Sequence, residues 1–241
     1  MPSAGILVIG NEILSGKVID TNSPFLCSEL RALGVDVERI HVIPDVIETI
    51  AQNVREMSQS HDFVFTSGGV GPTHDDLTMD GVALAFHQSL ELNKSVAERI
   101  ERAQGHPPNE CQLKMAFLPS GAVLIDAGDL WFPVIVVKNV HIFPGIPELL
   151  RRKFLSVRER FRGVPFQLKR VFLLQRESDI ARYLNETLSE FPELLMGSYP
   201  RTGEGTHHVM VTLESRDPVY LGRALDALLA RLPAEAVQKV E

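Results

Sequence analysis

The stretch that decides the fold is Ser67-Gly68-Gly69-Val70-Gly71-Pro72-Thr73-His74-Asp75-Asp76-Leu77-Thr78. It follows an apolar run that predicts a buried strand at 63–66, and it precedes a predicted helix at 79–86. Glycines let backbone N–H groups approach a phosphate closely, and the start of a helix adds partial positive charge. This strand, turn and helix together predict a site for a phosphorylated ligand.

Two adjacent carboxylates, Asp75 and Asp76, lie in the second half of this turn. They would repel a phosphate unless a divalent cation lay between the carboxylates and the ligand. The turn therefore predicts a metal-assisted site that uses Mg²⁺, Mn²⁺ or Co²⁺. His74 can contact a phosphate or can be a solvated loop residue.

Outward from the turn, strands and helices alternate, which predicts a mostly parallel sheet with helices on both faces. Upstream, the hydrophobic pattern predicts strands at 6–9 and 37–43, each followed by a helix, at 24–33 and 46–57. Downstream, it predicts helices at 93–104, 111–117 and 148–160, a turn at 119–121, and a hairpin of strands 134–137 and 141–143.

The pattern changes near residues 161–165. Beyond this point it predicts a strand at 166–174, a helix at 178–191, strands at 194–199 and 207–213 around a loop at 201–205, and a helix at 221–232. The prediction is an α/β domain at 1–162 and a small α+β subdomain at 163–241, which is within the usual range of domain sizes.

Polar residues follow each of the first three predicted strands, where ligands bind in open α/β sheets. They are Gly10-Asn11-Glu12, Pro44-Asp45 and the glycine turn itself. A single aspartate after a strand is more often a cap or turn former, which is the alternative for Asp45. Asp20-Thr21-Asn22 offers a helix cap, although a cap needs only one of the three, which leaves the others for ligand contact.

Two common nucleotide-binding patterns are absent from the sequence. The first strand is followed by Gly10-Asn11-Glu12-Ile13-Leu14-Ser15-Gly16, which lacks dinucleotide-fold spacing, and Gly16-Lys17 is followed by Val18 rather than Ser or Thr. The net charge of −7 argues against nucleic-acid and acidic-membrane partners. The two cysteines, Cys27 and Cys111, lack zinc-ligand spacing and make a disulfide framework implausible. Because the N-terminal apolar run is also too short for a signal peptide and no later run is long enough to span a membrane, we expect a cytoplasmic protein.

Together these segments resemble the molybdopterin-binding superfamily of the Mog and MoaB proteins. Within it they are most similar to the N-terminal domain of CinA proteins and to the N-terminal molybdopterin-binding-like domain of FAD synthase. The resemblance covers nearly the whole chain and is carried by 10–16, 20–22, 44–45, 68–78, Phe143-Pro144-Gly145-Ile146-Pro147-Glu148-Leu149-Leu150 and, more weakly, Gly197-Ser198-Tyr199-Pro200.

The resemblance implies a three-layer α/β/α fold that binds a pterin or an adenine dinucleotide at the carboxyl edge of the sheet. In Mog-type proteins the block reads Gly-Gly-Thr-Gly with a later Arg-Asp; here Val70 replaces the Thr, Asp75 replaces the Arg, and Asp76 matches the functional Asp. A carboxylate in place of a cation disfavours direct phosphate pairing and favours a metal. This agrees with the CinA and FAD synthase branch, which is associated with metal-dependent cleavage of dinucleotide pyrophosphates.

The expected function is therefore hydrolysis of FAD or ADP-ribose to AMP and a phosphorylated product. Asp45, Asp75 and Asp76 are the predicted catalytic residues, and Glu12, Asp75 and Asp76 the predicted metal ligands. The predicted ligand-binding residues are Gly10, Asn11, Glu12, Asp20, Thr21, Asn22, Ser67, Gly68, Gly69, Gly71, Thr73, Thr78, Pro144 and Gly145.

Two alternatives stay open. One is a non-catalytic module that binds molybdopterin or a nucleotide, and the other is a molybdopterin adenylyltransferase. FAD synthesis and nicotinamide-nucleotide deamidation are not expected, because the sequence shows no synthase or amidase domain. Relatives of this fold commonly self-associate, so the resemblance implies a homo-oligomer.

Overall fold

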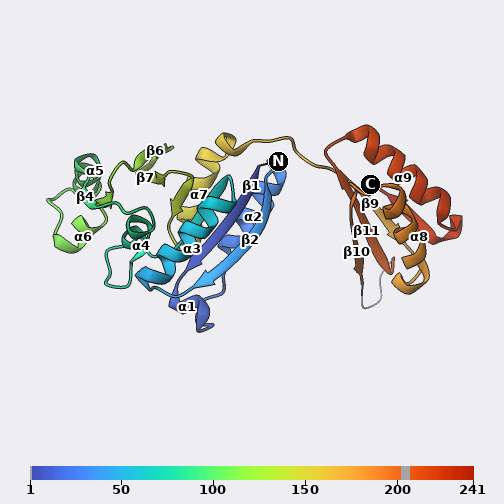
Figure 1. The fold of residues 1–241 in the computed structure, drawn as a ribbon, viewed down its shortest axis with the longest axis horizontal. Helices are drawn as coiled ribbons and strands as arrows, with labels where there is room; N and C mark the ends of the chain where they lie inside the picture. Colours follow the sequence, from blue (N-terminus) through green and yellow to red (C-terminus); the bar gives the residue numbers. More distant parts are fainter. Residues whose placement is uncertain (1, 202–206) are drawn as a thin grey trace. The chain divides into compact units, whose positions relative to one another are not determined.

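The computed structural model describes residues 2–201 and 207–241. The chain divides into two compact units, Met1–Gly163 and Val164–Glu241, next to the predicted boundary (Figure 1). None of the helices in these described ranges combines the length and apolar character that crossing a membrane requires.

The first unit is built on a six-stranded sheet with the strand order β2-β1-β3-β8-β7-β6. Strands β1, β2, β3 and β8 are parallel, while β7 is antiparallel to both β6 and β8. The strands are β1 (Ser3–Ile9), β2 (Asp36–Ile43), β3 (Phe63–Ser67), β6 (Val123–Ala127), β7 (Leu130–Val137) and β8 (Val140–Phe143). The mostly parallel sheet is confirmed, and so is the hairpin, which turns at Lys138 with a positive φ of 54°.

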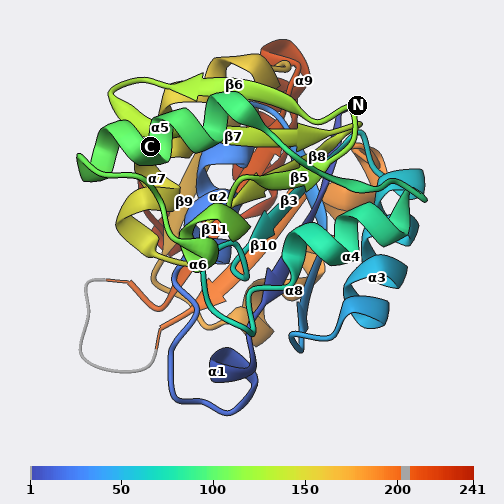
Figure 2. The same ribbon diagram turned by 90° about the vertical axis from the view of Figure 1, so that its left-hand side faces the viewer.

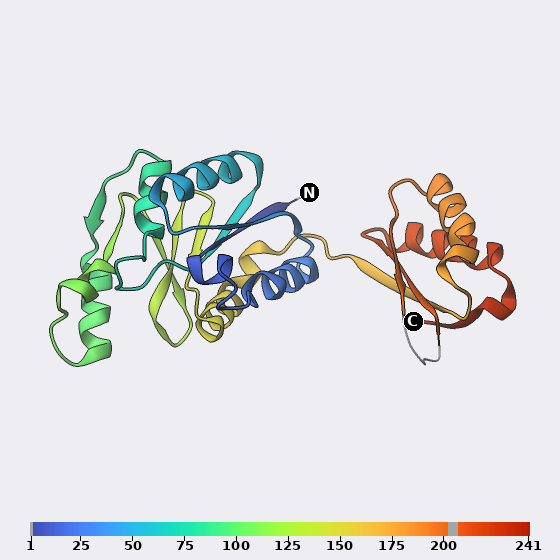
Figure 3. The same cartoon turned by 90° about the horizontal axis from the view of Figure 1, so that it is seen from below.

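Helices cover both faces of this sheet (Figure 3). They are α1 (Asn11–Leu14), α2 (Asn22–Ala32), α3 (Ile47–Ser60), α4 (Thr78–Ala85), α5 (Lys94–Gln104), α6 (Glu110–Lys114) and α7 (Pro147–Val157), the last followed by a 3₁₀ turn, Arg158–Phe161. Alternate residues of β1 point to opposite faces. Leu7 therefore packs with the core of α3, α4 and α5, whereas Ile6 packs with that of α2 and α7. This is a three-layer α/β/α arrangement.

The segment between α4 and β6, residues 86–122, is the part of the first unit whose secondary structure differs most from the prediction. The helix predicted at 111–117 ends at Lys114, because Phe117 enters a short strand, β5 (Phe117–Pro119), paired with β4 (Leu90–Leu92). Strand β7 begins at Leu130 rather than at the predicted residue 134, and no element was predicted at β6. Helix α5 packs against β7 (Figure 2). Because β7 is antiparallel to β8, with Ile135 paired to Ile142, its early start at Leu130 extends beyond the carboxyl end of β8.

The second unit is a four-stranded antiparallel sheet, β10-β11-β9-β12, with two helices on one face. Its elements are β9 (Gln167–Leu173), α8 (Glu177–Glu190), β10 (Leu195–Pro200), β11 (Val209–Ser215), α9 (Pro218–Arg231), a 3₁₀ turn (Ala234–Ala236) and β12 (Val237–Val240). The last strand was not predicted. Most of the loop predicted at 201–205 lies outside the described residues.

Candidate functional site

The glycine bend leaves the carboxyl end of β3, the strand between β1 and β8. Gly68 and Gly69 have φ of 108° and 63°, values that side-chain-bearing residues rarely adopt. A Cβ on Gly68 would lie 2.1 Å from the Ile9 carbonyl oxygen, and one on Gly69 would lie 2.4 Å from Thr78 Oγ1. The bend is thus held so close to its neighbours that only glycine fits.

Thr78 supports the bend from behind. Its buried hydroxyl donates to the Gly68 carbonyl at 2.8 Å, and its backbone N–H donates to the Gly69 carbonyl at 3.0 Å. In contrast, the backbone N–H groups of residues 69–71 donate no hydrogen bond to any described part of the chain. The carbonyls of the bend are therefore satisfied internally, while three consecutive donors remain for a ligand.

Asp76 closes the turn that follows the bend. Its Oδ2 accepts a 2.8 Å hydrogen bond from the Thr73 N–H and a second one from the Thr73 hydroxyl. A Cβ on Gly71 would lie 2.7 Å from this same oxygen, so the absence of a side chain there makes room for the carboxylate. Oδ1 accepts no hydrogen bond from the described residues. Asp76 thus keeps one carboxylate oxygen for a ligand or a cation.

The neighbouring carboxylate, Asp75, is exposed on the outside of the turn. The Thr73 hydroxyl lowers the pKa of Asp75, and the positive charges of His74 and Lys114 act in the same direction. Lys114, at the end of α6, also donates to the Thr73 carbonyl at 2.5 Å. The structure therefore separates the predicted pair, because Asp76 lines a pocket and Asp75 faces outward.

Asp45 supports the start of α1. Its Oδ2 accepts a 2.8 Å hydrogen bond from the Asn11 N–H, and the Gly10 N–H donates to Ile43. Partial burial raises the pKa of Asp45, and the negative charges of Glu12 and Asp75 raise it further, whereas the Asn11 N–H opposes the change. The charges of Glu12 and Asp75 therefore both disfavour the ionised form of Asp45 at this edge of the sheet.

The side chain of Asn22, at the start of α2, links the end of β3 to the loop that follows β8. Its Nδ2 donates to Ser67 Oγ at 2.9 Å and to the Gly145 carbonyl at 2.7 Å, and its buried Oδ1 has no partner. Asp20 Oδ1 caps α2 by accepting from the N–H groups of Asn22 and Ser23, at 2.9 and 3.1 Å. The side chain of Thr21 makes no such cap and is exposed. The orphaned oxygen of Asn22 is satisfied only by an additional donor.

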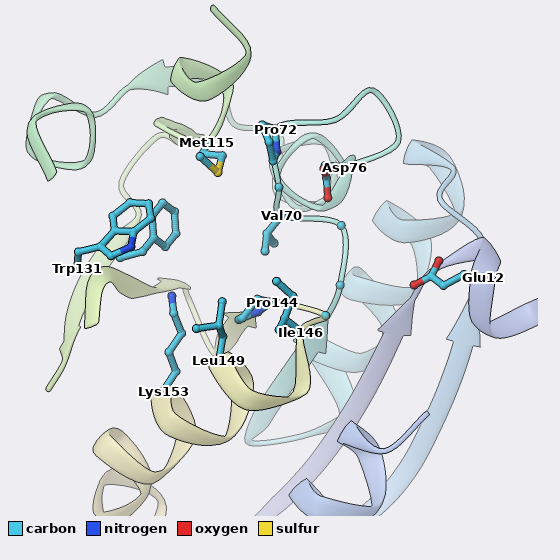
Figure 4. Close-up of a pocket in the computed structure, with 15 residues that line it drawn as sticks. Glu12, Val70, Pro72, Asp76, Met115, Trp131, Pro144, Ile146, Leu149 and Lys153 are labelled. Atoms are coloured by element: carbon cyan, nitrogen blue, oxygen red, sulfur yellow. The ribbon is translucent and has the colours of Figure 1, made fainter. Parts of the chain in front are cut away.

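A pocket of about 430 Å³ lies between the bend and the start of α7 (Figure 4). One side carries the bend with Glu12 and Asp76, and Pro144 and Gly145 form part of the wall. The opposite side is aromatic and apolar, and it includes Trp131 of β7. A smaller hollow of about 60 Å³, lined by residues that include 20–22, and another of about 320 Å³, lined by Lys114, adjoin the bend.

Lys153 extends from α7 into the aromatic side of the pocket. It is only 4% exposed, and its Nζ donates to the Pro133 carbonyl at 2.7 Å and lies 4.6 Å from the centre of the Phe132 ring. Burial lowers the pKa of Lys153 to about 7. A lysine in this setting has N–H donors to spare and no carboxylate to neutralise it among the described residues.

Comparison of the sequence with known protein families gives two matches. Residues 5–182 match the family described as a probable molybdopterin binding domain. The chain belongs to this molybdopterin-binding family. Residues 165–241 also match the family described as the middle domain of FAD synthase. Both the suspected classification and the fold class are therefore confirmed.

Individual relatives of the chain agree with this family assignment. A protein of Archaeoglobus fulgidus is 34% identical over 222 residues, covering 91% of this chain and 93% of its own. A probable FAD synthase of Caenorhabditis briggsae is 33% identical over 88% of this chain, and the chain spans 46% of that protein. A crystal structure of CinA from Thermoplasma acidophilum superposes with a TM-score of 0.62 at 29% identity, over 67% of this chain and 99% of its own.

The side chains of the pocket can be compared with those that usually hold a divalent metal ion. Among residues 2–201 and 207–241, no three His, Cys, Asp or Glu side chains are arranged to hold a metal ion together. Mg²⁺ in phosphate-binding sites is often held by one or two carboxylates and by the substrate phosphates. Asp76 Oδ1 and Glu12 both line the pocket and offer carboxylate oxygens of the kind that such a site uses.

The sequence prediction missed Trp131, Phe132 and Lys153. The predicted strand began only at Val134, so the two aromatic residues were left outside it. A signal for Lys153 was present, because it follows Leu150 by three residues and precedes Val157 by four, the spacing of the buried face of α7. A lysine on an apolar helix face is a candidate binding residue.

Proposed function

We propose that this molybdopterin-binding family member hydrolyses a dinucleotide pyrophosphate such as FAD or ADP-ribose. The proposal rests on one pocket that is lined both by residues 69–71, whose backbone N–H groups donate to no described residue, and by the carboxylate of Asp76. The N–H groups of residues 69–71 lie beside Asp76, whose Oδ1 accepts no hydrogen bond from the described chain. Donors bind the phosphates, and the carboxylate binds a cation or a water molecule. The names of the FAD synthase relatives support a flavin dinucleotide as one candidate substrate.

In this reaction the oxygen of water forms a bond to one phosphorus, and the bridging P–O bond breaks. The products are AMP and a second phosphate monoester, and both protons of the water go to solvent where the two monoesters are dianions, above their second pKa of about 6. Glu12 and Asp76 would hold Mg²⁺, Mn²⁺ or Co²⁺, which supplies charge neutralisation and an acidified water when bound. Residues 69–71 orient the phosphate, and Asn22 and Thr78 hold the loops in place.

The test is release of AMP from FAD and from ADP-ribose in the presence of each metal. Asp76→Asn keeps the size of the side chain but removes the negative charge, so we expect AMP release to fall at least a hundredfold. Glu101→Gln removes one charge from an exposed position of α5 and should leave the rate unchanged. AMP release that persists unchanged in Asp76→Asn contradicts the proposed role of this carboxylate.

A second candidate is ligand binding without turnover. The observation that favours it is the absence of a three-carboxylate or histidine cluster in the described part of the chain. Tight binding of FAD or a pterin with no AMP release under any metal would select this function. Formation of an adenylylated pterin from ATP would instead select an adenylyltransferase.

A further inference from the structure

The aromatic end of the pocket combines a buried cation with flat apolar walls. Trp131 and Phe132 meet edge to face with their ring centres 5.3 Å apart, although Trp131 is 45% exposed. Figure 4 shows Lys153 pointing toward Trp131, on the side of the pocket away from Glu12 and Asp76. An exposed tryptophan beside a buried lysine is a surface on which a planar ring stacks.

Because Lys153 has N–H donors to spare, a ring that binds beside it should carry a hydrogen-bond acceptor. In its charged form, which predominates below about pH 7, Lys153 has three N–H donors and uses one on Pro133. The residues around it here, Trp131, Phe132 and Leu149, provide no carboxylate. A bound group that carries an acceptor would therefore satisfy a donor that is otherwise buried without a partner. A phosphate is better placed at residues 69–71, whose N–H groups are free.

Resting on the proposed function, we propose that this end of the pocket binds a fused pyrimidinone ring, with Lys153 donating a hydrogen bond to a ring carbonyl. Flavins and pterins both carry such a carbonyl. Adenine has an amino group at the equivalent position, so a donor would face the ammonium of Lys153. Lys153 is thus a specificity-determining residue that selects the flavin or pterin half of a dinucleotide over the adenine half.

The experiment measures the binding of phosphate-free rings to the full chain without metal, so that turnover plays no part. Trp131 is the only tryptophan of the chain, and its fluorescence reports a ring stacked against it. Riboflavin and biopterin test the two natural sources of the carbonyl. Inosine and adenosine form a matched pair that differs mainly in carbonyl against amino group. We expect inosine to bind about tenfold more tightly than adenosine at pH 6, where Lys153 is mostly charged.

Lys153→Met keeps the length of the side chain and removes its donors, and it should abolish the preference for inosine and weaken riboflavin and biopterin about tenfold. Arg152→Met is the matched control, because Arg152 is exposed on the same helix and pairs with Asp129 at 2.8 Å. Thermal unfolding of both variants checks for a folding defect, since Lys153→Met also leaves the Pro133 carbonyl without its donor.

Three results would overturn the proposal: equal binding of inosine and adenosine, a preference that survives Lys153→Met, or no quenching by any of the rings. Binding by riboflavin alone or biopterin alone supports the subsite and identifies its source. Failure of AMP release with the ring preference intact contradicts the proposed hydrolysis and leaves this subsite standing.

Discussion

At the scale of single residues, some polar side chains of the site hydrogen-bond to the loops, whereas others keep an atom that accepts no hydrogen bond within the described chain. Thr78 and Asp20 bind backbone atoms of the protein itself, and Asp45 uses one of its two carboxylate oxygens on the Asn11 N–H. Asp76 Oδ1 and Asn22 Oδ1 accept no hydrogen bond within the described chain. The sequence predicted all five as site residues, Asp45 and Asp76 as catalytic and the other three as ligand-binding, because a polar residue in a loop looks the same whether it supports the backbone or contacts a ligand.

His141 predicts acid sensitivity of the first unit. It is packed against the rings of Phe65 and Phe161, with ring centres 5.4 and 4.9 Å away, and burial lowers the pKa of His141 to about 4 from 6.5. Because the native pKa is the lower one, the unfolded chain binds more protons between pH 6.5 and 4. The free energy of unfolding should therefore fall as the pH falls through this range, by about 3 kcal/mol from this group.

Denaturant unfolding from pH 7 to pH 4 measures this effect. His141→Phe should lose about 3 kcal/mol less than the unaltered protein over this interval, because it has no buried imidazole to protonate. His106→Gln is the control, since His106 is exposed. If His141→Phe loses stability with acid as steeply as the unaltered protein, the buried neutral imidazole is not the cause.

At the scale of elements, periodicity predicted the long helices and the buried strands, since each has a continuous apolar face or run. It failed at β4, β5 and β12, which have three or four residues each, too few for a period to show. The glycine bend was predicted from its glycines together with the apolar strand before it and the helix after it. The aromatic side of the pocket was not, because Trp131 and Lys153 come together only when β7 packs beside α7.

A pair of glycine substitutions tests whether the backbone conformation of the bend is needed for ligand binding. Gly69 and Gly105 both have positive φ, 63° and 76°, but a Cβ would clash with Thr78 only at Gly69, whereas Gly105 ends α5 in open space. Gly105→Ala should cost about 1–2 kcal/mol from backbone strain alone. Gly69→Ala should cost more and should weaken FAD binding at least tenfold, because the N–H donors are displaced.

Urea unfolding and FAD titration of the two variants give the comparison. The unaltered protein and Gly105→Ala should bind FAD equally well. Equal losses of stability and unchanged FAD binding in both variants would show that the bend tolerates a side chain and does not position the ligand.

At the scale of the whole molecule, each unit has its own core. The first unit holds two apolar clusters, one on each face of its sheet, and the second holds one around Val211 and Leu228. Gly163 belongs to the first unit, where its N–H donates to the Leu33 carbonyl at 2.7 Å. Self-association and a cytoplasmic location stay predictions at this scale.

All the residues that line the pocket belong to the first unit, within the described part of the chain. A fragment of residues 1–163 should therefore fold alone and bind riboflavin within about twofold of the full chain, because no core residue and no lining residue is removed. Circular dichroism on heating tests its folding, and the Trp131 titration tests its pocket. A fragment that unfolds cooperatively but binds no ring would show that residues 164–241 complete the site, whereas a fragment that does not fold would contradict the independence of the first core.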